Sequence, residues 1–248
     1  LSGHRLRHRL ESKGNLMQLS PAQRPSARIE AERLLRKQQA MDTETSLHAQ
    51  IVALEKDVSA AAAIASRAER MAFKRDVLLP RWMPTAQVWL NGDGENQNPV
   101  FAWCVIWLFD SGQLDQALDW ADVAIQRGHE TPAAFGSSFQ VFVADTVLSW
   151  AEAEAVEGHD VEPYFSRTLE NVMQHWNVYE VIKAKYLKFA GLHLLRDENR
   201  EPRAAATEDR DVLLRAKELL EQAKGFDPKC GVGTMLQRIA ARLRVLDK

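Results

Sequence analysis

Apolar residues along the chain recur at helical spacing, and no segment shows the strict alternation of a strand. Residues 27–79 contain no proline or glycine, so this stretch can form helix throughout, about 80 Å long if unbroken. A seam with the four-three spacing of a heptad repeat runs along it. Its apolar part predicts oligomerisation through a partner helix, at Leu47, Ile51, Leu54, Val58, Ala61 and Ala65, and it continues at Ala68 and Ala72.

Two arrangements of this stretch stay open. Thr43, Thr45 and Ser46 make a poor helix interior, so a helical hairpin of residues 27–41 against 46–79 competes with one continuous rod. Pro80 and Pro84 predict the end of the rod, because proline cannot continue a helix. The turn-rich residues 91–99 follow.

The remaining sequence predicts a body of short helices. Residues 99–110 are apolar nearly all round, so this helix is expected at the centre of a core. A Ser-Gly turn leads to a helix over 114–125, and further helices are expected over 133–157, 160–175, 178–196, 209–226 and 231–246. The segments "GQLDQALDWADVAI" and "GFDP" resemble parts of a tetratricopeptide (TPR) unit, and the polar residues 196–209 predict a mobile loop.

The predicted fold class is therefore all-α: an N-terminal long helix or helical hairpin with a coiled-coil seam, then a TPR-like helical-repeat body. We expect a basic flexible arm over residues 1–26, coiled-coil, DNA-binding and oligomerisation helices over 27–79, and the repeat body over 80–248. Cys104 and Cys230 cannot make a disulfide framework or a four-cysteine zinc site. Without a long apolar stretch or a signal-peptide core, a soluble cytoplasmic protein is expected.

Charge divides the chain in two, although the net charge is only −2. Residues 1–75 hold 14 Lys+Arg against 8 Asp+Glu, and residues 76–248 hold 18 against 26. Basic side chains bind phosphates without regard to sequence, so the first segment predicts DNA contacts. The predicted DNA-binding residues are Arg5, Arg7, Arg9, Lys13, Arg24 and Arg28, followed by Arg33, Arg36 and Lys37.

Catalytic motifs are not visible in the sequence. There is no G-x-x-x-x-G-K-[ST] phosphate loop, which argues against ATP hydrolysis by that mechanism, and no G-x-S-x-G elbow. No cofactor or metal site is evident. Two histidines and the acidic residues beside them are expected to cap turns or lie on the surface. Two rows of carboxylates are expected to form a solvated acidic face. The histidine groups are His129–Glu130 and His159–Asp160–Glu162, and the carboxylates are Asp115, Asp119, Asp122, Glu152, Glu154 and Glu157.

Three segments carry a family resemblance: "KRDVLLPRWMPTAQVWLNGDG", "NPVFAWCVIWLFDSGQLDQALDWADVAIQRG" and "VFVADTVLSWAEAEA". They resemble the GpM-type small terminase subunits of temperate tailed phages, and the likeness covers about residues 25–157. The resemblance implies a DNA-packaging protein of the host cytoplasm, absent from the mature virion. Such a protein binds double-stranded viral DNA at the packaging site, forms a homo-oligomeric ring and delivers the DNA to the ATPase large subunit, which docks on the helical body.

The same family is described as the terminase endonuclease subunit, so the resemblance also implies cleavage of cohesive ends. Enzymatic activity stays open, because no catalytic residue can be named, and Mg²⁺ is expected only if this chain carries the nuclease. A different class of function also fits the helical pattern: a TPR-like oligomeric adaptor without DNA binding. Ring stoichiometry, the recognised DNA sequence and the docking surface for the large subunit cannot be read from the sequence.

Overall fold

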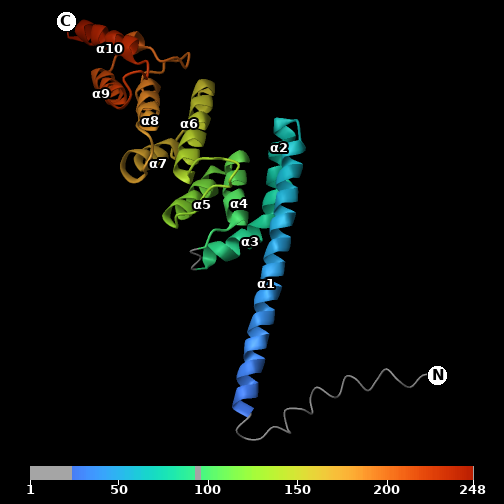
Figure 1. Cartoon of the computed structure of the whole chain (residues 1–248). Helices are drawn as coiled ribbons and strands as arrows, with labels where there is room; N and C mark the ends of the chain where they lie inside the picture. Colours follow the sequence, from blue (N-terminus) through green and yellow to red (C-terminus); the bar gives the residue numbers. More distant parts are fainter. Residues whose placement is uncertain (1–23, 93–95, 248) are drawn as a thin grey trace. The chain divides into compact units, whose positions relative to one another are not determined.

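The computed structural model describes residues 24–92 and 96–247, and it confirms the all-α prediction for them, with ten α-helices and no strand (Figure 1). The described residues divide into two compact units, one up to Ala60 and the other from Ala61 onward. The predicted segment boundaries at residues 26 and 79 stay a prediction. The α-helices are α1 (Arg24–Ala63), α2 (Arg67–Phe73), α3 (Leu79–Asn91), α4 (Pro99–Asp110), α5 (Leu114–Gln126), α6 (Phe139–Glu157), α7 (Tyr164–Glu170), α8 (Glu180–His193), α9 (Arg210–Phe226) and α10 (Gly233–Leu246).

Helix α1 runs for 40 residues without interruption. It passes through residues 42–46, so the predicted hairpin is wrong. The intrinsic cost of a threonine or serine in a helix is only about 0.5 kcal/mol per residue, too little to break a helix that has no glycine or proline there. Pro25 lies in the first turn, where a helix has no use for the missing N–H group.

The continuous rod to residue 79 is also wrong, because α1 ends at Ala63. Residues 64–66 are not helical, and Ser66 begins α2 by accepting a hydrogen bond from the Glu69 N–H group at 3.3 Å. Ser66 and Glu69 have the serine-x-x-glutamate spacing of a capping box. The Arg70 guanidinium donates to the Ile64 carbonyl at 2.7 Å, which closes the turn.

The two prolines do not end the helical region, contrary to the prediction. A π-helical turn, η2 (Lys74–Leu78), joins α2 directly to α3. In this wider turn the Leu79 N–H group bonds to the Lys74 carbonyl, five residues back. Pro80 then occupies the first turn of α3, and Pro84 lies inside that helix. The π turn changes the hydrogen-bond register just before Pro80, where an α-helical N–H donor would be missing.

Helix α4 is central to the core of residues 61–248, as its all-round apolar pattern predicts. Nine of its 12 residues are buried. The Asn98 side chain caps it by accepting the Phe101 N–H group at 3.0 Å, and Pro99 follows at the first helical position. Phe101 stacks on Trp120 of α5, with ring centroids 5.4 Å apart. Helices α3 and α5 both pack against α4, so the core is built from neighbours in sequence.

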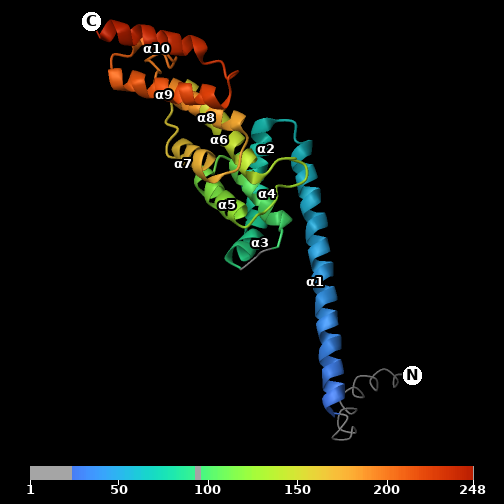
Figure 2. The same ribbon diagram turned by 60° about the vertical axis from the view of Figure 1, so that its left-hand side comes forward.

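The later helices agree with the predicted ranges within a few residues, except that residues 133–138 form turns before α6. A second π turn, η3 (Asn171–His175), follows α7, and a short 3₁₀ helix, η4 (Ala204–Ala206), precedes α9. The Tyr186 hydroxyl of α8 donates to the Ala144 carbonyl of α6 at 2.7 Å. Helix α9 packs against both α8 and α10 (Figure 2). These pairs do not establish TPR units, which stay a prediction.

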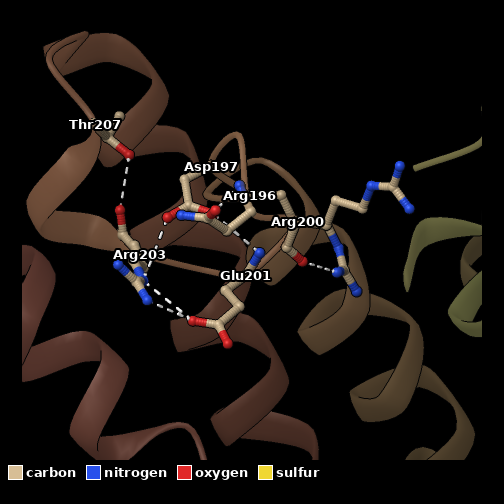
Figure 3. Close-up of polar contacts among 7 residues, drawn as sticks. Arg196, Asp197, Arg200, Glu201, Arg203 and Thr207 are labelled. Carbon is tan, nitrogen blue, oxygen red and sulfur yellow. Dashed lines mark hydrogen bonds and ion pairs between the residues drawn. The ribbon is translucent and has the colours of Figure 1, made fainter. Parts of the chain in front are cut away.

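The polar segment between α8 and α9 is held by specific hydrogen bonds, in contrast to the predicted mobile loop. Asp197 accepts the N–H group of Asn199 at 2.9 Å. It also accepts the N–H group of Glu201 at 3.1 Å (Figure 3). The Arg203 guanidinium lies 3.3 Å from Asp197 and 2.7 Å from Glu201. Ala204 is buried in the cluster of α9 and α10. The charged residues of the segment between α8 and α9 therefore bind one another and are not merely solvated.

Candidate nucleic-acid interface

The predicted DNA-binding residues fall into three groups. Arg5, Arg7, Arg9 and Lys13 lie outside the described residues. Arg24 and Arg28 belong to the first two turns of α1. The side chains of Arg33, Arg36 and Lys37 are exposed on α1, and their three- and four-residue spacing places them on one face. The structure therefore brings these last three residues together on an accessible surface.

Helix α1 as a whole is not basic. Residues 24–63 hold six Lys+Arg and six Asp+Glu. Glu30 and Glu32 precede the three basic residues by about one turn, so the local field is weaker than three cations alone would give. The positive excess of residues 1–75 resides instead in residues 1–23 and in residues 64–75, each with four basic residues and one acid.

The residues of the predicted oligomerisation seam lie on one helix only as far as Ala61. Leu47 is 53% exposed, Ile51 and Val58 are half-buried, and Leu54 and Ala61 are buried. Ala65 lies in the break between α1 and α2, so it does not continue the stripe along the same helix. Oligomerisation through these residues stays a prediction.

Residues 64–75 contribute a basic wall to the largest groove among the described pockets, about 660 Å³ in volume. Arg67 and Arg70 of α2 and Lys74 of η2 face it, and aromatic side chains of α4 and α6 also line it. The Lys74 ammonium pairs with Asp110 at 2.5 Å, while Arg75, on the same turn, pairs with Asp76 at 2.8 Å. Two of the four cations of residues 64–75 are therefore neutralised by carboxylates within the chain.

The carboxylates of α5 pair with side chains of α7. Arg167 of α7 bridges Asp119 and Asp122 at 2.8 and 2.6 Å. A hydrogen bond to Asp115 raises the pKa of Tyr164, also on α7. Within residues 24–92 and 96–247, no three His, Cys, Asp or Glu side chains are arranged to hold a metal ion.

The two histidines singled out in the sequence, His129 and His159, have hydrogen-bond or ion-pair partners within the chain. His129 is buried, and its Nε2 accepts the Asn98 N–H group at 2.6 Å. Its Nδ1 must then carry the proton that is donated to the Glu130 carbonyl, 2.9 Å away. Burial lowers the pKa of His129, which keeps the ring neutral. The exposed His159 pairs with Glu154 at 2.7 Å.

With this geometry in place, the comparisons with known proteins decide the family. A family model described as "Phage small terminase subunit" matches residues 51–181, from the second half of α1 to the start of α8. The chain belongs to the phage small terminase subunit family. Its predicted resemblance is thereby confirmed, and the match includes the π turn, the prolines and the core helix α4.

Two curated relatives support the assignment of this family member. The chain is 36% identical over 197 residues to the "Probable terminase, endonuclease subunit" of Haemophilus phage HP1 (strain HP1c1), covering 79% of this chain and 70% of that protein. It is 26% identical over 231 residues to the "Terminase, endonuclease subunit" of Escherichia phage P2, covering 91% and 86%. No solved structure matches it. No helix within the described ranges combines the length and apolar character needed to cross a membrane.

Dividing the chain only at residue 75 conceals a third charged region. Residues 76–179 hold three Lys+Arg against 15 Asp+Glu, whereas residues 180–248 hold 15 against 11. The acidic part coincides with most of the matched family region. The basic C-terminal part was missed because its charge was averaged with that of the acidic helices, and shorter windows along the sequence would have revealed it.

Proposed function

We propose that this chain is the small subunit of a phage DNA-packaging terminase that binds double-stranded viral DNA at the packaging site. The family match over residues 51–181 carries the proposal. The exposed Arg33, Arg36 and Lys37 support it, since basic side chains on one helix face can contact successive phosphates. The strong acidity of residues 76–179 restricts phosphate contacts to the two basic ends of the chain.

Assembly and delivery complete the proposed role. The chain forms a homo-oligomer, in which the exposed Leu47 and the half-buried Ile51 and Val58 of the α1 stripe contact a second copy. Oligomerisation multiplies weak phosphate contacts through avidity. The oligomer, a ring in this proposal, presents DNA to the ATPase large subunit, which docks on the helices of residues 80–248.

A gel-shift experiment with the full chain and DNA that contains the packaging site tests DNA binding. We expect a shifted complex whose affinity falls as salt rises, because released counterions contribute to binding. Reversing the charge of Arg33, Arg36 and Lys37 together should weaken the complex and leave the oligomer intact. Absence of any complex at low salt would support the alternative function, an oligomeric adaptor without DNA binding.

The names of both relatives favour a second candidate function, DNA cleavage. In this proposal the chain cuts DNA at cohesive ends, with Mg²⁺ as the metal. The purified chain is incubated with packaging-site DNA and magnesium, and the products are separated on a sequencing gel. Discrete cut ends that EDTA abolishes would place the nuclease in this chain. Uncut DNA under conditions where the gel shift shows full binding would contradict it.

A further inference from the structure

Unpaired basic side chains gather near the end of the described chain. Lys224, Lys229, Arg238 and Arg244 are exposed, and none has a carboxylate partner within the described residues. Cations elsewhere in residues 61–247 are mostly paired with acids, as Lys74 is with Asp110. Unpaired cations keep their full charge for an external anion, so this part of the surface differs from the rest of the body.

The acids in the same region are already engaged. Helix α10 contains three arginines and no acidic residue. Asp227 accepts the Lys229 N–H group at 2.9 Å, and Asp247 pairs with Arg210 at 3.1 Å. Arg242, the third arginine of α10, donates to the Thr207 carbonyl at 2.9 Å and is half-buried. The positive charge of Arg238 and Arg244 is therefore not cancelled by a neighbour on the same helix.

Two lysines of α8 lie beside the turn between α9 and α10. The Lys188 ammonium donates to the Cys230 carbonyl at 2.7 Å, and the Lys183 ammonium lies 5.8 Å from the centroid of the Phe226 ring. The carbonyl and the ring fix the positions of both lysines without neutralising them. We define the C-terminal cationic surface by its six residues: Lys183, Lys188, Lys224, Lys229, Arg238 and Arg244.

We infer that the C-terminal cationic surface is a second contact surface for the phosphate backbone of DNA. The inference rests on the proposed DNA-binding function and adds a surface outside the N-terminal segment and outside the matched residues 51–181. Four of its six residues are lysines, which are depleted in protein–protein interfaces and common in phosphate contacts. Contacts to the phosphate backbone carry no sequence information, so they strengthen binding to any DNA sequence equally.

Three double variants of the full chain are compared, and each removes two positively charged side chains that solvent can reach. The test variants are Lys224→Ala/Lys229→Ala and Arg238→Ala/Arg244→Ala. The matched control is Arg215→Ala/Lys217→Ala on α9, where each cation already pairs with a glutamate, at 2.7 and 3.6 Å. Circular dichroism and thermal melting check that all three fold as the wild type does.

Binding to a fluorescein-labelled DNA duplex is measured by anisotropy over a range of salt concentrations. The slope of log K against log salt is negative, and each lost phosphate contact makes it shallower by about 0.9. The slope of each test variant should therefore be shallower than that of the wild type by about 1.8 per bound protomer. When salt rises from about 50 to 200 mM, the affinity of the wild type for DNA should therefore fall by about ten times more than the affinity of a test variant. The control should retain the wild-type slope.

The outcomes separate this inference from the proposed function. If the wild type binds no DNA, the proposed function fails. If the wild type binds but the test variants match the control in affinity and slope, only the inference is overturned. Test variants that bind DNA normally but fail to bind the purified large subunit would instead assign the surface to a protein partner, which also overturns it.

Discussion

Replacing His129 by alanine removes two features of the core at once. Its Nε2 accepts the Asn98 N–H group at 2.6 Å, next to the start of α4. Its ring packs against three aromatic residues, with centroids 5.2 Å from Trp89, 5.8 Å from Phe101 and 6.2 Å from Phe139. An unpaired N–H group costs about 1–3 kcal/mol, and an emptied aromatic site adds a cavity. We expect the free energy of unfolding to fall by about 3–5 kcal/mol.

The assay is urea unfolding, monitored by tryptophan fluorescence. The fluorescence reports on this site because the Trp89 ring lies against the His129 ring. His129→Phe keeps an aromatic ring but loses both the acceptor for the Asn98 N–H group and the donor to the Glu130 carbonyl, so it should cost about 1–3 kcal/mol. His159→Ala is the control, because its exposed pair with Glu154 contributes less than about 1 kcal/mol. A loss below about 1 kcal/mol for His129→Ala would refute the reasoning.

The same residue predicts a dependence on pH. Burial lowers the pKa of His129 from the ordinary value of 6.5, so the unfolded chain binds the proton more readily than the folded one. The stability from the neutral ring is present above pH 6.5 and is lost as pH falls toward the folded pKa. Burial also lowers the pKa of His193, in the same direction. The wild type should therefore lose more stability on acidification than His129→Phe, and equal losses would contradict this assignment.

Four further substitutions give simpler expectations. Gly158→Ala should destabilise by about 1–2 kcal/mol in a thermal melt, because φ is +77° and the new Cβ would lie 2.6 Å from the Arg200 Nε. Gly225→Ala, with open space around the Cβ, should be neutral or stabilising. Arg167→Ala should cost about 1 kcal/mol in urea unfolding, because it breaks two partly exposed ion pairs. Ser66→Ala should cost about 0.5–2 kcal/mol through the lost cap, and an unchanged melting temperature would argue against the capping bond.

Helix content and the central core could be predicted because each depends on local pattern. The all-round apolar sequence of α4, with Pro99 after a capping Asn98, indicated a buried helix directly. The break before Ser66 had a sequence signal that the prediction did not use, because Ser66 and Glu69 have capping-box spacing. The predicted end of the helical region at Pro80 was wrong because a π turn accommodates this proline. The π turn has no local sequence signal that we can name.

The candidate interface was less predictable, because net charge over a long window does not show which cations are paired. Lys74 belongs to the basic N-terminal segment, yet Asp110, 36 residues away, neutralises it. Arg238 and Arg244 lie in the segment that is acidic on average, yet they have no partner within the described residues. Pairing depends on tertiary contacts between distant residues, which periodicity cannot supply.

Native mass spectrometry of the full chain, with and without packaging-site DNA, tests the central claim most directly. We expect a discrete homo-oligomer of the 28.1 kDa chain, and an increase in the mass of this oligomer by the mass of the DNA when DNA is added. A high concentration of ammonium acetate should remove the DNA and leave the oligomer, because phosphate contacts weaken with salt. A monomer that takes up no DNA at low ionic strength would contradict the account.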